Sequence, residues 1–464
     1  MDINVLKNTI MIVRRMQRTW PLWLFCLLLA VCVGCDDKRT VITILGENSG
    51  NLQSMRLNKD VYEQSQNVTL DFKGNSFEET LQKANDDFIS RTGYYDIVLE
   101  YNVAISSFVR NNYVYTKDEL TNGFLPSDKE FEDDIFDAAW HEIGWYYRPV
   151  KKMLSDSPVA VGYPFAANTM LLVYNQEMFK DPDRRAAYRK LYGDSLDVPR
   201  TWEQFKNIAK FFTDTAHHTY GLCMTGADKG WLYYEYCAIL YGMGGAVFKK
   251  DRGWEGNSTT LLMLDSPAAL KATEFYDSLS SYNCPHDFLE TGAEQQSVYM
   301  KDGNIAMAIM WSDYLYKFTF DAGGKNVDTR FGFAPLPGGK SPLAGGVFYV
   351  NRQSDHAKEA MQYIMSIMKE PYQVMLTKKG LCSALRSVYE DPEVLKIPYA
   401  RALKTSLENG VYMFEAGPEC GLVQDVITKY MGSSWRRGNA SGALASACKE
   451  IREGRDSIYR SFQQ

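Results

Sequence analysis

Short apolar segments alternate with a helical pattern near the start of this 464-residue chain, and this alternation limits its possible folds more than any other feature. Residues 40–45, 67–72 and 95–99 are short and rich in β-branched side chains, as expected of strands. Between the last two, residues 77–90 repeat apolar side chains at helical spacing. This order predicts a parallel sheet with right-handed crossovers, and therefore an α/β fold.

The segments that follow two of these strands are candidates for a binding site. Ligands of parallel sheets bind at the carboxyl ends of the strands. Glu47 and Asn48 follow the first predicted strand, and Tyr101 and Asn102 follow the third. We therefore expect these four side chains to lie near a ligand.

The rest of the chain continues the mixture of helices and strands, and its length predicts two or three domains. A segment rich in tryptophan and tyrosine, residues 140–147, is expected to be helical. Thr201 is expected to cap a helix that begins at Trp202, with Gln204 at the capping-box position. Further strands are predicted at residues 158–162, 165–175, 220–222, 304–310, 331–336 and 343–350, and further helices at residues 231–241, 421–431 and 440–461.

The N-terminus has the pattern of an export leader. Basic residues precede an apolar run at residues 20–34, which is too short to span a bilayer and is typical of a secretory signal. The run ends at Cys35, which is followed by two aspartates. This junction resembles a bacterial lipobox, which implies removal of residues 1–34 and acylation of Cys35 in a lipid bilayer. An ordinary signal peptide and an uncleaved anchor are the alternatives.

Composition excludes several classes of function. The 51 basic and 57 acidic residues give a net charge of −6, or −9 without the leader, so we expect no nucleic-acid partner. No CxxC pair occurs beyond Cys35, and adjacent His217 and His218 cannot both face one metal, so no metal or cofactor is expected. The cysteines beyond the leader permit either disulfides or buried thiols, and the sequence does not choose between them; they are Cys223, Cys237, Cys284, Cys382, Cys420 and Cys448.

Two short motifs imitate catalytic signatures without their context. Residues 193–196 spell Gly-Asp-Ser-Leu, as in one class of serine hydrolases, but a charged helical run precedes them and Pro199 follows. Residues 339–341 resemble the tail of a phosphate-binding loop, but Ala334 occupies the position of its first glycine and prolines stiffen the segment. We therefore expect the chain not to be an enzyme.

Five segments, in order, resemble one known family. They are residues 41–51, 163–175, 199–203, 303–310 and 343–350, and their order is similar to that in the family 1 extracellular solute-binding proteins, the maltose-binding-protein-like receptors of ABC importers. The resemblance implies a two-lobed periplasmic-binding-protein fold, type II-like, with a ligand cleft between the lobes and several hinge crossings. It implies lobe I at residues 35–166 plus 345–409, and lobe II at residues 167–344 plus 410–464.

The resemblance also implies ligand-binding residues. Glu47 matches an acidic residue that holds sugar hydroxyls, whereas Asn48 stands where the maltose receptor has a lysine. Tyr101 is the nearest substitute for a stacking tryptophan, and Asn168 falls on a ligand-binding glutamate. The remaining members of the implied set are Asn102, Trp231, Tyr233, Trp311, Asp313 and Gly345.

A sugar is the solute that the residues themselves favour. The C–H face of a pyranose packs on flat aromatic rings, and its hydroxyls need donors and acceptors such as Asn, Asp and Glu. The implied partners are a small solute, the membrane permease of an ABC importer and the bilayer, and the location is extracytoplasmic, with inner and outer membrane left open. The alternatives are a surface lipoprotein that captures glycans for a non-ABC uptake system, and an anchored hydrolase.

Overall fold

The structure, a computed structural model, describes residues 39–146, 149–150, 153–154, 158–227, 229–250, 260–319, 329–410 and 418–461. The predicted leader and Cys35 lie outside these residues. Within them, no helix combines the length and the apolar character that a membrane span requires.

The N-terminal segment forms the predicted parallel unit. Its elements are β1 (Thr40–Glu47), α3 (Gly50–Ser65), β2 (Val68–Asn75), α4 (Phe77–Ser90) and β3 (Ile97–Tyr101). Strand β1 pairs in parallel with both β2 and β3, which gives the order β2-β1-β3 and confirms the prediction. Helix α4 has the predicted bounds, because Ser76 and Glu79 form a capping box at its start.

Two long strands connect this unit to a second one. They are β8 (Pro164–Asn175) and β14 (Leu343–Val350). The first half of β8 pairs with β14, which in turn pairs with β3, and the second half of β8 pairs with β12 (Ile305–Trp311) and β13 (Phe331–Ala334). The result is one sheet in the order β2-β1-β3-β14-β8-β12-β9, with β13 also on β8.

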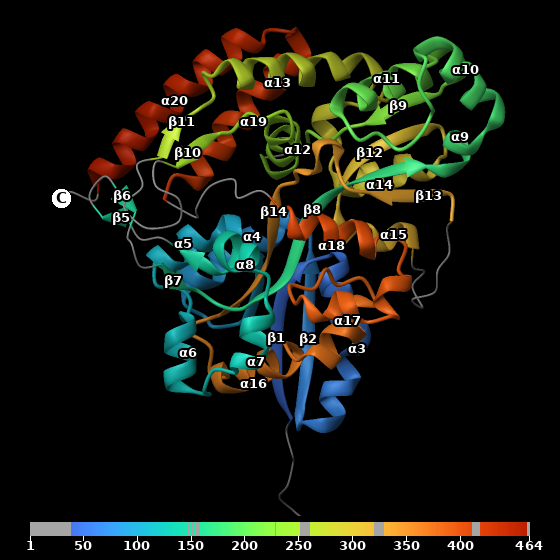
Figure 1. Cartoon of the computed structure of the whole chain (residues 1–464). Helices are drawn as coiled ribbons and strands as arrows, with labels where there is room; N and C mark the ends of the chain where they lie inside the picture. Colours follow the sequence, from blue (N-terminus) through green and yellow to red (C-terminus); the bar gives the residue numbers. More distant parts are fainter. Residues whose placement is uncertain are drawn as a thin grey trace, which may run out of the picture.

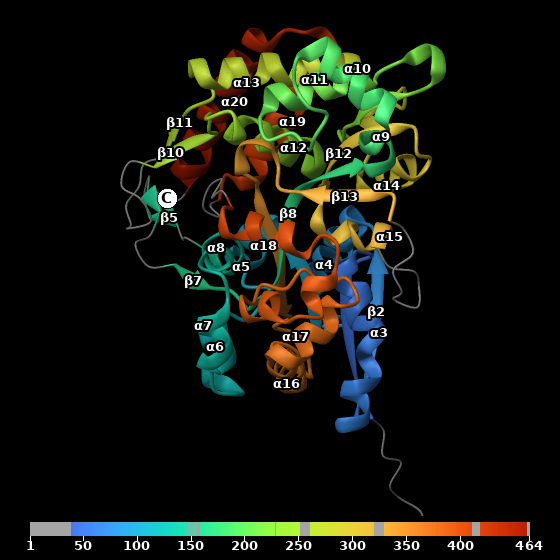
Figure 2. The same cartoon turned by 45° about the vertical axis from the view of Figure 1, so that its right-hand side comes forward.

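The sheet carries two lobes, which lie at the bottom and the top of Figure 1. Lobe I is built on β2, β1, β3 and most of β14, and lobe II on the end of β8 with β12, β13 and β9 (Tyr220–Cys223). Figures 1 and 2 both show β8 running from one lobe into the other.

Helices cover both parts of the sheet. In lobe I, α3 and α4 pack on the N-terminal strands, α16 (Ala357–Ile367) packs on β14, and α17 (Glu370–Thr377) packs on α3. The segment between β3 and β8 adds α5 (Ile105–Arg110), α6 (Lys117–Gly123), α7 (Lys129–Asp134), α8 (Asp137–Ala139) and the short pairs β4 (Trp145–Tyr146) with β7 (Val159–Ala160) and β5 (Pro149–Val150) with β6 (Met153–Leu154).

Lobe II is mainly helical outside its strands. Helices α11 (Trp202–Phe212) and α14 (Ala293–Lys301) pack on β9 and β12. Helix α12 (Lys229–Gly242) packs on α13 (Pro267–Ser278) and on the C-terminal helix α19 (Cys420–Arg437), which pairs with α20 (Ala440–Ser461). The remaining elements of lobe II are α9 (Gln176–Lys180), α10 (Pro182–Tyr192), β10 (Phe248–Lys250), β11 (Thr260–Leu262) and α15 (Tyr316–Thr319). Helix α18 (Ala400–Glu408) packs on the connecting strand β8.

Local signals account for most of these elements, with one correction. Thr201 caps α11 and Gln204 completes its capping box, as predicted. The prediction of one helical segment at residues 140–147 is wrong at Trp145 and Tyr146, which form strand β4 by pairing with β7. Tertiary pairing overrides local propensity there. Tyr147 lies outside the described residues.

The six cysteines of the described residues are free thiols, and all six are buried. The sequence allowed either disulfides or buried thiols, and the structure has buried thiols. Cys223 and Cys284 are neighbours, since the amide of Cys284 donates to the carbonyl of Leu222 at 2.8 Å.

Candidate functional site

A cavity of about 50 Å³ lies where the two lobes meet. This volume is below the range of typical small-molecule sites, about 300–1,000 Å³, so a sugar also needs the adjoining groove or a wider separation of the lobes. Its lining comes from both lobes and from the strands that connect them: Glu47, Phe77, Tyr101, Asn102, Val103, Asn168, Trp231, Tyr234, Trp311, Asp313, Ala344 and Gln424.

Most of the residues proposed from sequence lie together in this lining. They are Glu47, Tyr101, Asn102, Asn168, Trp231, Trp311 and Asp313. Asn48 lies in an adjoining groove instead. The sequence therefore located the region of the cavity, although not its complete lining.

Tyr233 and Gly345 do not line the cavity. The Tyr233 side chain is fully buried within lobe II, and its ring packs edge-on against that of Tyr234, with centroids 5.0 Å apart. Gly345 lies in β14 opposite Ala167 of β8, where a Cβ atom would sit 2.1 Å from the carbonyl oxygen of Ala166. Glycine at this position allows the two connecting strands to approach each other closely.

The ends of strands position the polar side chains of the site. Glu47 ends β1 and Tyr101 ends β3, and since these strands are parallel their carboxyl ends meet at one edge of the sheet. Trp311 ends β12, and Asp313 lies two residues beyond it. Asn168 lies in β8, where it accepts a hydrogen bond from the Asn51 amide at 3.2 Å.

Two tyrosine hydroxyls connect the carboxylates of the two lobes. The Tyr314 hydroxyl donates to Glu47 Oε1 at 2.7 Å. The Tyr101 hydroxyl donates to Glu47 Oε2 and lies 3.2 Å from Asp313 Oδ2. Because Tyr314 and Asp313 belong to lobe II and Glu47 and Tyr101 to lobe I, these contacts join the lobes at the cavity.

The two carboxyl groups share a low-dielectric site and have shifted pKa values. Glu47 is 5% exposed and Asp313 is 2% exposed. Burial raises the pKa of Glu47, and the hydrogen bonds from Tyr101 and Tyr314 oppose that shift. Burial, reinforced by the charge of Glu47, raises the pKa of Asp313 to about 8. At neutral pH Asp313 is therefore mostly protonated, and the tyrosine hydroxyls donate to Glu47.

Aromatic rings form the apolar walls of the cavity. Trp311 packs edge-on against Tyr234, with centroids 5.0 Å apart, and Trp231 packs edge-on against Tyr314 at 5.7 Å. The Trp311 side chain is 6% exposed, whereas Trp231 is only half-buried. Edge-on packing leaves ring faces available to a ligand.

A groove of about 470 Å³ adjoins the cavity. It shares Glu47, Phe77 and Trp231 with the cavity and runs between the first turns of α4 and α14. This route gives a ligand longer than one ring a continuous path along the lobe boundary.

Several lining residues were missed by the sequence reasoning. Phe77 follows β2, so the rule that ligands lie at the carboxyl ends of strands could have found it. Tyr234 lies one residue beyond the proposed Tyr233, and its orientation depends on how α12 packs. Gln424 comes from α19, far along the chain, and no local pattern indicates it.

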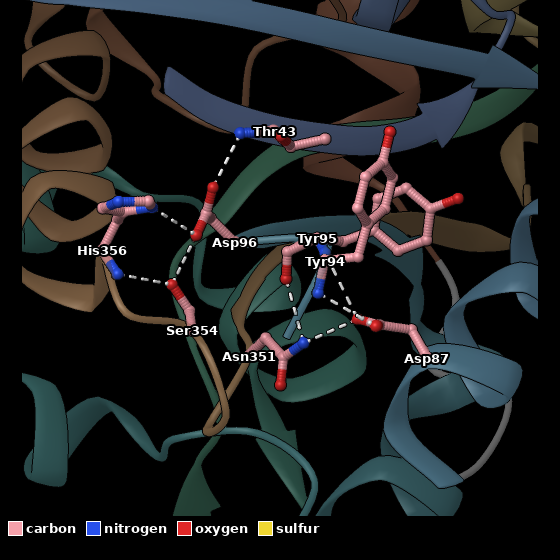
Figure 3. Close-up of polar contacts among 8 residues, drawn as sticks. All are labelled: Thr43, Asp87, Tyr94, Tyr95, Asp96, Asn351, Ser354 and His356. Atoms are coloured by element: carbon pink, nitrogen blue, oxygen red, sulfur yellow. Dashed lines mark hydrogen bonds and ion pairs between the residues drawn. The ribbon is translucent and has the colours of Figure 1, made fainter. Parts of the chain in front are cut away.

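A second polar cluster contains serine, histidine and aspartate, the residue types of a serine-hydrolase site (Figure 3). The Ser354 hydroxyl donates to Asp96 Oδ1 at 2.6 Å, and His356 Nδ1 lies 3.2 Å from the same oxygen. Ser354 accepts from the backbone amide of His356 and donates to Asp96, so the imidazole is not placed to take the hydroxyl proton as a catalytic histidine does. Asn351 donates to Asp87 and to the carbonyl of Tyr95, and the cluster ties the end of β14 to the start of β3.

No cluster of three or more histidine, cysteine or acidic side chains suited to a metal ion occurs among the described residues.

Comparison with known proteins identifies the family and the fold. A family profile described as bacterial extracellular solute-binding protein matches residues 59–401. The chain is also similar to the maltotriose-binding protein of Pyrococcus abyssi, with 23% identity over 318 residues. That match covers 65% of this chain and 58% of the relative's length.

Solved structures share the whole architecture. An ABC transporter solute-binding protein from Agrobacterium radiobacter, in complex with ribitol, has a TM-score of 0.70 and 20% identity, and the match covers 90% of this chain and 98% of that one. The Thermus thermophilus maltotriose-binding protein, bound with maltotriose, has a TM-score of 0.69 and 19% identity over 90% and 100% of the two chains. These matches confirm the predicted two-lobed fold.

Proposed function

Because this chain belongs to the bacterial extracellular solute-binding proteins, we propose that it binds a sugar or a short oligosaccharide in the cavity between its lobes. Membership of this family also confirms the prediction that the chain is a binding protein and not an enzyme. The observation that carries the proposal is the composition of the cavity, where aromatic rings stand beside buried carboxyl and amide groups.

The proposed ligand contacts follow from this lining. Trp231 and Trp311 supply faces for sugar rings, and Glu47 and Asn168 supply acceptors and donors for hydroxyls. The adjoining groove has room for further sugar units. The named relatives that bind maltotriose and ribitol support a polyhydroxylated solute.

A thermal-shift screen tests the function. A ligand that binds only the native state stabilises it, by about 2.7 kcal/mol when the ligand concentration is 100 times its Kd, and therefore raises the melting temperature. We expect at least one member of a panel of mono- and oligosaccharides to raise the melting temperature in a concentration-dependent way. A panel of amino acids and other non-sugars provides the comparison, and a response only to non-sugars would contradict the sugar proposal.

We assign lobe I to residues 35–166 plus 345–409 and lobe II to residues 167–344 plus 410–464. The pairing of β8 and β14 with strands of both lobes supports crossings near residues 167 and 345. The packing of α19 on α12 supports a third crossing after residue 409. Solute that contacts both lobes would favour closure about these crossings.

Delivery to the membrane permease of an ABC importer is the transport step that we propose, since solved relatives of the same fold are ABC transporter receptors. Capture for a non-ABC uptake system is the rival. Deleting the importer's permease gene should abolish solute uptake, and unchanged uptake would favour the rival.

We propose that the protein is anchored outside the cytoplasm through an acylated Cys35. The support is the leader pattern, with its short apolar run and the cysteine at its end. Replacing Cys35 with serine should prevent acylation and move the protein from the membrane fraction to the soluble fraction. Cys26→Ser, within the leader, is the matched control and should stay with the membrane. Membrane partition of the Cys35→Ser protein would contradict the proposal.

A further inference from the structure

Among the lining residues that the structure describes, several in this site are acidic and none is basic. Of the lining residues of the cavity, Glu47 and Asp313 are ionisable carboxyl groups and none is lysine or arginine. The groove adds Glu78, Glu79, Glu290 and Glu294, again without a basic residue. The groove glutamates are exposed to solvent, whereas Glu47 and Asp313 are buried, so this pair is what a neutral sugar would leave without a cationic partner.

The basic group close to the pair is already engaged. Lys317 forms an ion pair with Glu294, and its ammonium lies 4.8 Å from the centre of the Tyr314 ring. Its charge acts on Glu47 and Asp313 only at a distance. The other titratable groups that face the pair are Tyr101, Tyr314, Tyr316, Glu78, Glu100, Glu294 and Cys382.

The hydrogen bonds of Tyr101 show which carboxyl group of the pair carries a proton. Tyr101 has one hydroxyl proton, which it donates to Glu47, so a protonated Asp313 donates to the Tyr101 oxygen. A protonated Asp313 thereby satisfies the Tyr101 oxygen. A solute cation beside the pair would take the place of that proton and leave Asp313 ionised.

The walls of the cavity suit such a cation. Trp231, Trp311, Tyr234 and Phe77 surround the same space, and aromatic faces attract ammonium groups, most strongly when water is excluded. We propose that the solute carries a protonated amine, which binds beside the Glu47 and Asp313 carboxyl groups within this ring of aromatic side chains. The proposal rests on the function proposed above and specifies its solute as an amine-bearing sugar.

Binding of the amine has a defined proton balance. In the unliganded site the Asp313 carboxyl is protonated below about pH 8. When the ammonium group binds, the O–H bond of Asp313 breaks, its proton goes to the buffer, and the carboxylate pairs with the ammonium. Up to one proton is therefore released per solute bound, and affinity should rise with pH while the amine stays protonated.

Matched sugars provide the test. The β-1,4-linked glucosamine disaccharide and cellobiose have the same ring shape and linkage. The first carries amines where cellobiose carries hydroxyls. Titration calorimetry in two mildly acidic buffers with different ionisation enthalpies gives both affinity and proton release. We expect the glucosamine disaccharide to bind about tenfold or more tightly than cellobiose, with release of a substantial fraction of one proton. Spermidine serves as an amine without a sugar.

The variant Asp313→Asn keeps the shape of the side chain but has no acidic proton to release. We expect it to lose proton release and most of the preference for the amine, while its melting temperature stays near that of the parent. Asp183→Asn, exposed in the first turn of α10, is the control and should behave like the parent. Glu47→Gln should reduce the preference for the amine in the same way.

The outcomes separate the two proposals. Equal affinity for cellobiose and the glucosamine disaccharide, or a neutral sugar that binds without proton release, would overturn the amine proposal and leave the sugar receptor standing. Binding of spermidine alone, with proton release, would support the amine and contradict the sugar. If no amine and no sugar binds, both proposals fail.

Discussion

Replacing Trp231 with alanine is expected to weaken solute binding by about 2–4 kcal/mol, or roughly 30- to 1,000-fold in affinity. The ring lies at the start of α12, lines both the cavity and the groove, and is only half-buried in the protein itself. Its removal therefore takes a contact surface from the ligand while leaving most of the core packing intact. Titration calorimetry with the solute found by thermal shift measures the loss.

Trp140 provides the control, because it is also half-buried but lies outside the cavity lining. Trp140→Ala should bind solute like the parent. Trp311→Ala should lose affinity too, but Trp311 is 6% exposed, so that variant should also melt at a lower temperature. If Trp231→Ala and Trp311→Ala both bind within about threefold of the parent, the rings do not contact the solute.

The second large effect is on folding. Gly345→Ala should destabilise the protein by about 3 kcal/mol or more, because the new Cβ atom would lie 2.1 Å from the Ala166 carbonyl oxygen and 2.5 Å from Ile143 Cδ1. A backbone carbonyl inside paired strands cannot move aside as a flexible side chain can. Thermal and urea denaturation measure the change.

Gly421→Ala is the matched control, since a Cβ atom at that position would meet nothing within 4 Å. It should melt like the parent or slightly higher, because alanine favours a helix more than glycine does. A Gly345→Ala protein with parental stability would mean that β8 and β14 do not pack as closely as described.

Much of the fold could be predicted because its signals are local. Helix α4 has a capping box and a clear apolar repeat, so both of its ends were predicted correctly. Strand β12 is apolar and buried along its whole length, as expected of a strand covered on both faces. Tyr146 was assigned to a helix, because the pairing that makes it a strand depends on residues further along the chain.

The site was predictable where strands end and not elsewhere. Glu47 and Trp311 follow directly from strand ends at the sheet edge. Tyr101 was expected to supply a stacking ring, yet its hydroxyl contacts both carboxyl groups, which requires the two lobes to meet. Tyr314 and Gln424 lie near the cavity because of tertiary packing, which local sequence patterns do not predict.

The central claim is that a solute binds between two lobes that close on it. The hydrogen bond from Tyr314 to Glu47, at 2.7 Å, joins the two lobes at the cavity. Small-angle X-ray scattering of the parent protein, with and without saturating solute, tests the claim most directly. The radius of gyration should be smaller with solute, because the lobes move toward each other about β8 and β14. An unchanged radius of gyration at saturation would contradict it.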